Sequence, residues 1–218
     1  MTYSNPTKTV AQVYAYVKRA FGDESGVQLT DDDIVRWIND AQHEIAEAAG
    51  VIPAVATMSV TAGTPTYSLT SVTPLINSVA SISLDGRRVG NINVAQAEES
   101  ISLRDPDGTI NDHPMFWYSW AGSITFWPNP VQNHTMSIRY FAKPTDVTTT
   151  GTDLLTVPDY CFTDVVNYVL MRAYEMDENP QMMAAKQSEF ANSIAERGQS
   201  EMLSQSMTYE TGTVYELN

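Results

Sequence analysis

The spacing of apolar residues predicts two helices near the start of the chain. Apolar side chains recur every three or four positions over residues 10–21, and Thr9 with Gln12 forms a capping-box pattern in front of them. We therefore predict a helix over these residues. A second helix is predicted to begin after Thr30, because three aspartates follow it at the end where the helix dipole favours negative charge. Gly50 then supplies a stop.

The pattern changes to short alternating runs, separated by turn residues, over about a hundred residues in the middle of the chain. Asp85-Gly86 separates two such runs and predicts a tight hairpin turn. Residues 121–123 separate two aromatic-rich runs and predict a second hairpin, and the last strand is predicted over residues 136–141. A short helix is predicted over residues 95–103. About six short strands favour a small antiparallel β-sandwich or barrel.

Helical spacing returns in the last third of the chain. Apolar residues from Phe162 to Ala173 follow the period of a helix that is buried on one side. Asn179 and Pro180 form a cap and first-turn pair for a final helix that ends near Ser206. The twelve residues that follow lack a helical stripe and are predicted to be an extended arm.

These elements predict an α+β fold with a β module inserted into a helical bundle. Two N-terminal and two C-terminal helices form the bundle. The predicted parts are the bundle (1–53 and 158–206), the β domain (54–157) and the C-terminal arm (207–218).

Composition narrows the class of protein. The 218 residues are 43% hydrophobic and 17% charged, which predicts a folded chain with a sizeable core. With 12 basic and 26 acidic residues the net charge is −14, so a nonspecific grip on phosphate backbones is not expected. One cysteine, Cys161, allows no internal disulfide, and no apolar run is long enough to span a membrane.

We recognise no catalytic or metal-binding motif in the sequence. His43, His113 and His134 are far apart and lack metal-ligand spacing, so neither a metal nor another cofactor is expected. Acidic pairs such as those in Asp31-Asp32-Asp33 leave glycan hydrolysis as the weaker enzymatic alternative. Four aromatic residues suggest a stacking platform for a sugar, although a small β module needs most of them in its core: Trp117, Tyr118, Trp120 and Trp127.

The order of parts resembles the head-to-tail connector, or portal adaptor, proteins of tailed bacteriophages. The resemblance rests on helix two, on the central β segment, on the strand that ends at Tyr140 and on the opening of the closing helices. The residues that carry it are Leu29-Thr30-Asp31-Asp32-Asp33-Ile34-Val35-Arg36-Trp37-Ile38-Asn39-Asp40-Ala41 with Glu44-Ile45, then Ile124-Thr125-Phe126-Trp127-Pro128-Asn129-Pro130, then Val157-Pro158.

The resemblance implies a structural virion protein of the neck, without enzymatic activity, that assembles in the host cytoplasm. Such proteins form rings, commonly dodecameric, that join the capsid portal to a tail protein (nozzle, stopper or tube) and let the genomic DNA pass without specific binding. A net charge of −14 per copy fits a channel that repels DNA and lets it slide.

Two segments are candidate contacts with these partners. The arm carries apolar anchors on a segment that cannot fold alone, and relatives dock such tails onto the portal: the anchors are Tyr209, Val214, Tyr215 and Leu217. Arg87 and Arg88, at the tip of the first hairpin, are candidate contacts with a tail protein. The alternative to an adaptor is another virion module or a carbohydrate-binding β module.

Overall fold

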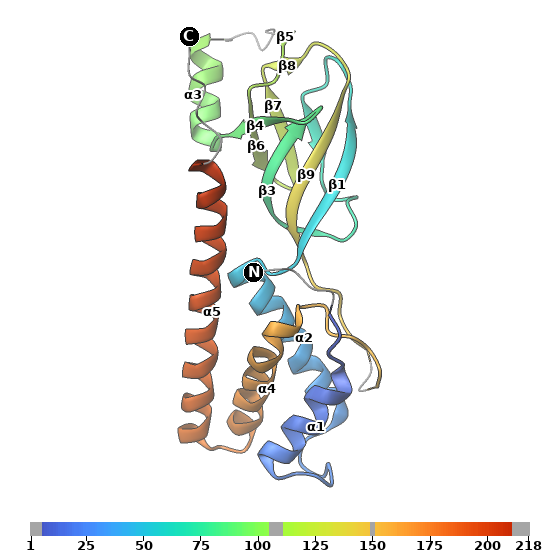
Figure 1. The fold of residues 1–218 in the computed structure, drawn as a ribbon, viewed down its shortest axis with the longest axis vertical. Coiled ribbons are helices and arrows are strands. Elements are labelled where there is room, and N and C mark those ends of the chain that lie inside the picture. The colour runs from blue at the N-terminus through green and yellow to red at the C-terminus, as the bar shows by residue number, and fades with distance from the viewer. Residues whose placement is uncertain (1–5, 105–110, 149–150, 211–218) are drawn as a thin grey trace. The chain divides into compact units, whose positions relative to one another are not determined.

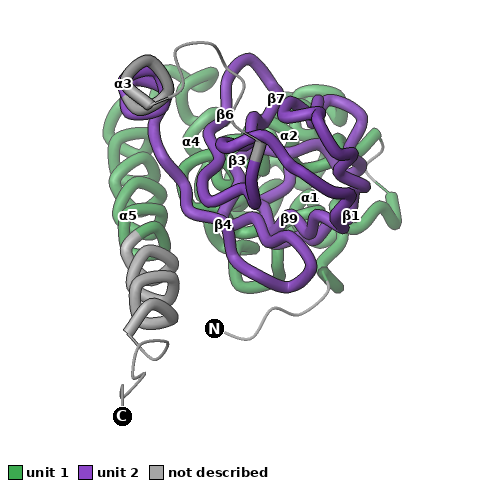
Figure 2. The backbone as a smooth tube through the Cα atoms, turned by 90° about the horizontal axis from the view of Figure 1, so that it is seen from above, with its two compact units in different colours: residues 1–52, 143–218 green, residues 53–142 purple. Residues whose placement is uncertain are grey.

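The chain forms two compact units in a computed structural model that describes residues 6–104, 111–148 and 151–210. The helical unit comprises residues 1–52 and 143–218, and the β unit comprises residues 53–142 (Figure 2). Helices and strands are thus segregated along the chain, which confirms the predicted α+β class.

The first two helices begin and end where the sequence predicts. Helix α1 (Val10–Phe21) starts at a complete capping box between Thr9 and Gln12, and α2 (Asp31–Ala49) starts where the Asp33 amide donates to the Thr30 hydroxyl. Gly22 and Gly50 follow the two helices with φ angles of 88° and 57°, a left-handed conformation that glycine adopts without strain.

Helix α4 is the core of the helical unit. A 3₁₀ turn, η1 (Asp159–Cys161), leads into α4 (Phe162–Met176), which packs against α1, α2 and α5 (Pro180–Glu210). Figure 1 shows α4 between α1 and α5. Aromatic contacts join these helices, because the Phe21 ring lies 5.5 Å from that of Tyr174 and the Tyr168 ring lies 5.2 Å from that of Phe190.

Helix α5 is longer than predicted. Its start is as expected, since the Met182 amide donates to the Asn179 side chain, but it continues through Glu210 and so includes the first residues of the predicted arm. The extension has a simple reason, because neither glycine nor proline interrupts the sequence between Gly198 and Gly212. The rest of the arm, residues 211–218, lies outside the described residues.

The β unit contains a seven-stranded curled sheet in the order β1-β9-β3-β4-β6-β7-β2, with β1, β3 and β9 prominent in Figure 1. A small two-stranded sheet pairs β5 with β8. The bounds are β1 (Pro53–Val60), β2 (Thr66–Ser68), β3 (Ile76–Leu84), β4 (Arg87–Asn91), β5 (Asn111–Asp112), β6 (Phe116–Trp120), β7 (Ser123–Trp127), β8 (Asn129–Pro130), β9 (His134–Ala142) and the helix α3 (Val94–Arg104).

The sheet is not purely antiparallel, so that part of the prediction is wrong. Strands β4 and β6 pair in parallel, with Gly90 opposite Phe116, and β5 and β8 do so as well. Parallel neighbours need a long crossover, and the segment that carries α3 supplies it between β4 and β6. The predicted sandwich or barrel is not confirmed, and the main strands form one curled sheet in which β4 joins two antiparallel groups.

Both predicted hairpins are confirmed. Asp85 and Gly86, which connect β3 to β4, have φ angles of 48° and 81°. Ala121 and Gly122, which connect β6 to β7, have φ angles of 48° and 72°. Two positive φ angles give a turn whose twist matches that of the flanking strands. The hairpins fix the register of β3 to β4 and of β6 to β7.

Residues 143–157 belong to the helical unit, whereas the sequence analysis placed them in the β domain. Side chains of α2 hold this segment. Asn39 exchanges two hydrogen bonds of 2.9 Å with the Val147 backbone, and the buried Gln42 Oε1 accepts a 2.6 Å hydrogen bond from the Thr156 amide. Leu155 and Val157 are buried. The sequence shows that the last strand ends before this segment, but the unit to which the segment belongs is decided by its tertiary contacts with α2.

Candidate interaction surfaces

The histidines take part in structural pairs. His43 Nε2 lies 2.7 Å from Asp146 Oδ1, and His134 Nδ1 lies 2.6 Å from Asp85 Oδ2. The His113 ring packs edge-on to the His134 ring at 5.9 Å. Within the described ranges, no three metal-ligating side chains gather in one place.

Cys161 is a buried thiol at the start of α4. Burial raises its pKa to about 12, so the thiol stays protonated and unreactive near neutral pH. Cys161 therefore packs as a small hydrophobic side chain in the core.

The acidic run that begins α2 serves the helix itself. Asp33 pairs with Arg36 at 2.7 Å and closes the N-cap with Thr30. Asp31 lies 3.7 Å from Lys18 and accepts a hydrogen bond from the Tyr14 hydroxyl. These contacts place Asp31 and Asp33 at the α1–α2 corner, where they stabilise the packing of the two helices.

The aromatic residues of the β unit are mostly internal. Trp117 and Trp127 are buried, and the Trp127 ring stacks on that of Phe116 at 6.3 Å. Trp120, at the end of β6, is 71% exposed. Of the four aromatic residues considered as a platform, Trp117 and Trp127 thus fill the core, Tyr118 is half-buried and Trp120 is exposed.

Arg87 and Arg88, the predicted tail-facing residues, are exposed where β4 begins. They line a hollow of about 650 Å³ in which Asp85, His113 and Met115 also take part. The Asp85 carboxylate accepts a hydrogen bond from the Thr135 amide and contacts the His134 ring, and these contacts hold the turn in place. The same two contacts lower the pKa of Asp85. The two arginines are therefore presented on a well-supported turn.

The predicted portal-binding residues lie almost entirely outside the described part of the chain. Tyr209 falls within α5, and nothing is described of its side chain. Val214, Tyr215 and Leu217 are outside the described residues.

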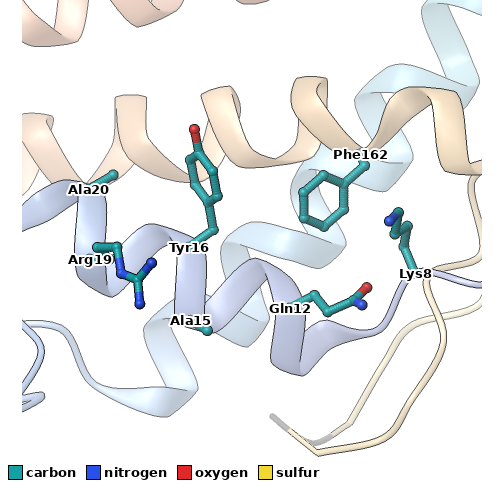
Figure 3. Close-up of a pocket in the computed structure, with 7 residues that line it drawn as sticks. All are labelled: Lys8, Gln12, Ala15, Tyr16, Arg19, Ala20 and Phe162. Atoms are coloured by element: carbon teal, nitrogen blue, oxygen red, sulfur yellow. The ribbon is translucent and has the colours of Figure 1, made fainter.

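A groove on α1 was missed by the sequence analysis. It has a volume of about 600 Å³, and Figure 3 shows Tyr16 and Phe162 on it, with Lys8 at one end and Arg19 at the other. The Lys8 ammonium lies 5.5 Å from the centre of the Phe162 ring, and Tyr16 is 57% exposed. Gln12, Ala15 and Ala20 complete the lining. We call this surface the α1 groove.

A second hollow of about 590 Å³ lies over α2 and α4 and is acidic. Asp40, Glu44 and Glu47 line it, together with His43, Ala48 and the Tyr168 ring. Burial, followed by the charge of Glu44, raises the pKa of Tyr168. We call this surface the α2 acidic face.

None of the described helices combines the length and the apolar character that a membrane crossing requires.

The described surfaces carry charged hollows on both units, and the histidine and carboxylate pairs described above serve the fold. Residues 8–212 match the family model described as SU10 adaptor protein, and the chain belongs to this family of phage head-to-tail adaptors. The connector resemblance is therefore confirmed. No curated protein matches the chain.

Family membership makes the chain a phage structural protein of the virion, near the head–tail junction, that associates with other head or tail proteins.

Proposed function

We propose that this protein forms a homo-oligomeric ring, dodecameric, that joins the capsid portal to a tail protein and lets DNA pass through its channel. The family match over residues 8–212 carries the proposal, because it spans both units. Copies assemble in the host cytoplasm and remain in the virion neck. The protein acts by binding and has no catalytic step.

The net negative charge of the chain supports the proposal that DNA passes through the channel without being bound. With 26 acidic against 12 basic residues, a channel built from many copies repels the phosphate backbone and lets the duplex slide. We expect a net acidic lumen. A ring whose lumen is lined mainly by lysine and arginine would contradict this expectation.

Electron microscopy of the chain mixed with its cognate portal tests the function. We expect portal particles that carry a second, stacked ring, and portal alone is the control. Copies that are monomeric in isolation still fit the proposal, because the portal can provide the template. Portal particles that stay bare at saturating chain concentration would contradict it.

The C-terminal arm, residues 207–218, is proposed to bind the portal through Tyr209, Val214, Tyr215 and Leu217. Apolar anchors on a polar tail gain affinity by ordering on a partner. Deletion of residues 208–218 should weaken portal binding and leave the far-ultraviolet circular dichroism of the remaining fold in place.

A length-preserving pair of variants sharpens the arm test. Tyr215→Ser with Leu217→Ser removes two anchors, while Thr211→Ser with Thr213→Ser keeps them. Portal affinity should fall only in the first. Equal affinities for the two would assign portal binding to another surface.

Arg87 and Arg88 are proposed to contact the tail protein. Charge reversal of both, Arg87→Glu with Arg88→Glu, should weaken tail binding and leave the stacked ring on the portal. Arg139→Glu, on the exposed side of β9, is the matched control. Tail binding that survives the double reversal would remove this assignment.

A further inference from the structure

The helical unit carries opposite charges on two of its helices. Residues 1–22, which include α1, contain three cations and no aspartate or glutamate. Helix α2 contains six acidic residues and one arginine. The α1 segment is therefore net positive in a chain of net charge −14, and it contrasts with α2 in the same unit.

The α1 groove has a cation at each end, of which Arg19 is exposed and Lys8 is half-buried beside the Phe162 ring. Lys18 is used internally, because its ammonium lies over the Tyr14 ring at 4.1 Å and pairs with Asp31. Lys8 and Arg19 instead stand at the two ends of the groove (Figure 3). Among the described residues no carboxylate forms an ion pair with Arg19, although this protein is rich in them.

The α2 acidic face concentrates three carboxylates, of which Glu44 interacts with the Tyr168 hydroxyl. Asp40, Glu44 and Glu47 are spaced by four and three residues and lie on one side of the helix. None of the three forms a salt bridge with a described cation. Like charges at this spacing destabilise a helix, so a cation from outside would relieve a local repulsion.

The two surfaces face different ways within the helical unit. The α1 groove lies between α1 and the first residue of α4. The α2 acidic face includes Tyr168, whose ring contacts Phe190 of α5, and Figure 1 shows α1 and α5 on opposite sides of α4. A single copy therefore leaves both surfaces open at once.

We infer that the α1 groove of one copy receives the α2 acidic face of a second copy. The inference rests on the proposed ring and identifies the surfaces that close it. Arg19 of one copy meets the carboxylates around Glu44 of the next, and Tyr16 and Phe162 provide the apolar contact at the centre. Each copy then uses both surfaces, which is the head-to-tail contact that generates rings.

Charge favours this pairing over two others. Joining two α1 grooves, or two acidic faces, would oppose charges of the same sign. Duplex DNA is a poorer occupant of the α1 groove, because binding a phosphate backbone firmly takes many cations and the groove offers Lys8 and Arg19.

Charge reversal on each surface tests the inference with full-length chain and cognate portal. Arg19→Glu alone, or Glu44→Lys alone, should raise the concentration needed to cap half of the portals by about tenfold or more. The combined variant, Arg19→Glu with Glu44→Lys, restores opposite charges at every contact and should recover most of the loss. Arg139→Glu and Glu196→Lys make the same charge changes at exposed positions outside both surfaces.

The outcomes separate the inference from the function on which it rests. Wild-type rings together with unaffected single reversals would overturn this interface and leave the adaptor function standing. Single reversals that fail without rescue in the combined variant would also overturn it, once thermal unfolding shows that each variant is folded. Duplex binding that is lost in Arg19→Glu while rings persist would reassign the groove to DNA. Wild-type chain that never caps the portal would remove both proposals.

Discussion

Gln42 shows how one buried side chain holds a long connection in place. Its Oε1 accepts from the Thr156 amide at 2.6 Å and from the Val157 amide at 3.4 Å, although these residues are more than a hundred positions away. Buried amides need acceptors, and this side chain provides one where no strand is available. The segment that returns from the β unit is thereby fixed to α2.

Replacement of the Gln42 side chain should destabilise the helical unit. Gln42→Leu keeps most of the volume and removes the acceptor, which should lower the free energy of unfolding by about 1–3 kcal/mol. Urea unfolding followed by circular dichroism measures the loss. Gln187→Leu, at an exposed position on α5, is the control and should change stability little. Equal stability of the two variants would contradict the role given to Gln42.

Asp23 organises the corner between α1 and α2 and makes that corner sensitive to acid. Its carboxylate accepts from the amides of Leu29, Val27 and Gln28 at 2.8, 3.0 and 2.9 Å. These hydrogen bonds, that of Leu29 first, lower the pKa of Asp23 to about 2.

The lowered pKa fixes the direction of a pH dependence. A folded-state pKa below the unfolded value gives stability that is present above about pH 4 and is lost as the pH falls towards 2. Asp23→Asn should therefore be less stable than wild type at pH 7, and the difference should shrink on acidification. Urea unfolding from pH 7 to pH 2.5 measures this, with Glu24→Gln as the control. A difference that stays constant over this range would refute the role of the carboxylate.

At the scale of elements, a buried ion pair fastens α5 to α4. Asp164 accepts from the Ser193 hydroxyl at 2.6 Å and from Arg197 Nε at 2.7 Å, and Arg197 also donates to the Tyr160 carbonyl. The Asp164 side chain is 2% exposed and that of Arg197 is 17% exposed. The register of the long helix against α4 therefore depends on a polar contact as well as on the Tyr168–Phe190 ring pair.

Breaking this pair on one side should be worse than removing both partners. Arg197→Met leaves a buried carboxylate without its cation and should destabilise the protein by about 3–5 kcal/mol. The double variant, Asp164→Leu with Arg197→Met, should recover a large part of this loss because no uncompensated charge remains. Thermal and urea unfolding of the three proteins make the comparison. Additive losses would argue against direct coupling of the two side chains.

The sequence was sufficient for elements whose signals are local. Capping at Thr9 and Thr30 and the turns at Asp85-Gly86 and Ala121-Gly122 act over a few residues, so spacing alone locates them. The parallel pairing of β4 with β6 depends on where in the sheet the chain returns after α3. The spacing of apolar residues does not predict which strands become neighbours. The end of α5 was placed near Ser206 because the residues that follow lack an apolar stripe, although the helix continues through Glu210.

At the scale of the whole molecule, the interaction surfaces were harder to predict than the fold. Arg87 and Arg88 could be named because a tight turn exposes its neighbours. The α1 groove needed the structure, since Phe162 comes from α4 and joins Tyr16 only after packing. One signal was nevertheless present, namely three cations and no acidic residue before Asp23, directly ahead of an acidic second helix.

The β unit should fold when it is separated from the helices. Residues 53–142 expressed alone should give a cooperative unfolding transition, because all seven strands of the main sheet lie within this segment. The fragment 53–115 is the control and should stay unfolded, since it lacks β6, β7 and β9. Circular dichroism and thermal unfolding make the measurement. An unfolded 53–142 fragment would show that the sheet depends on the helical unit.

The strand pairing at the edge of the β unit has a further consequence for how such proteins diversify. Pro53 pairs with Phe141 in the β1–β9 ladder, so the chain enters and leaves the sheet at adjacent points. A module with neighbouring ends can be exchanged, enlarged or trimmed by recombination while its host keeps the same two attachment points. In this way the β unit can change in the course of evolution while the helical unit is inherited unchanged.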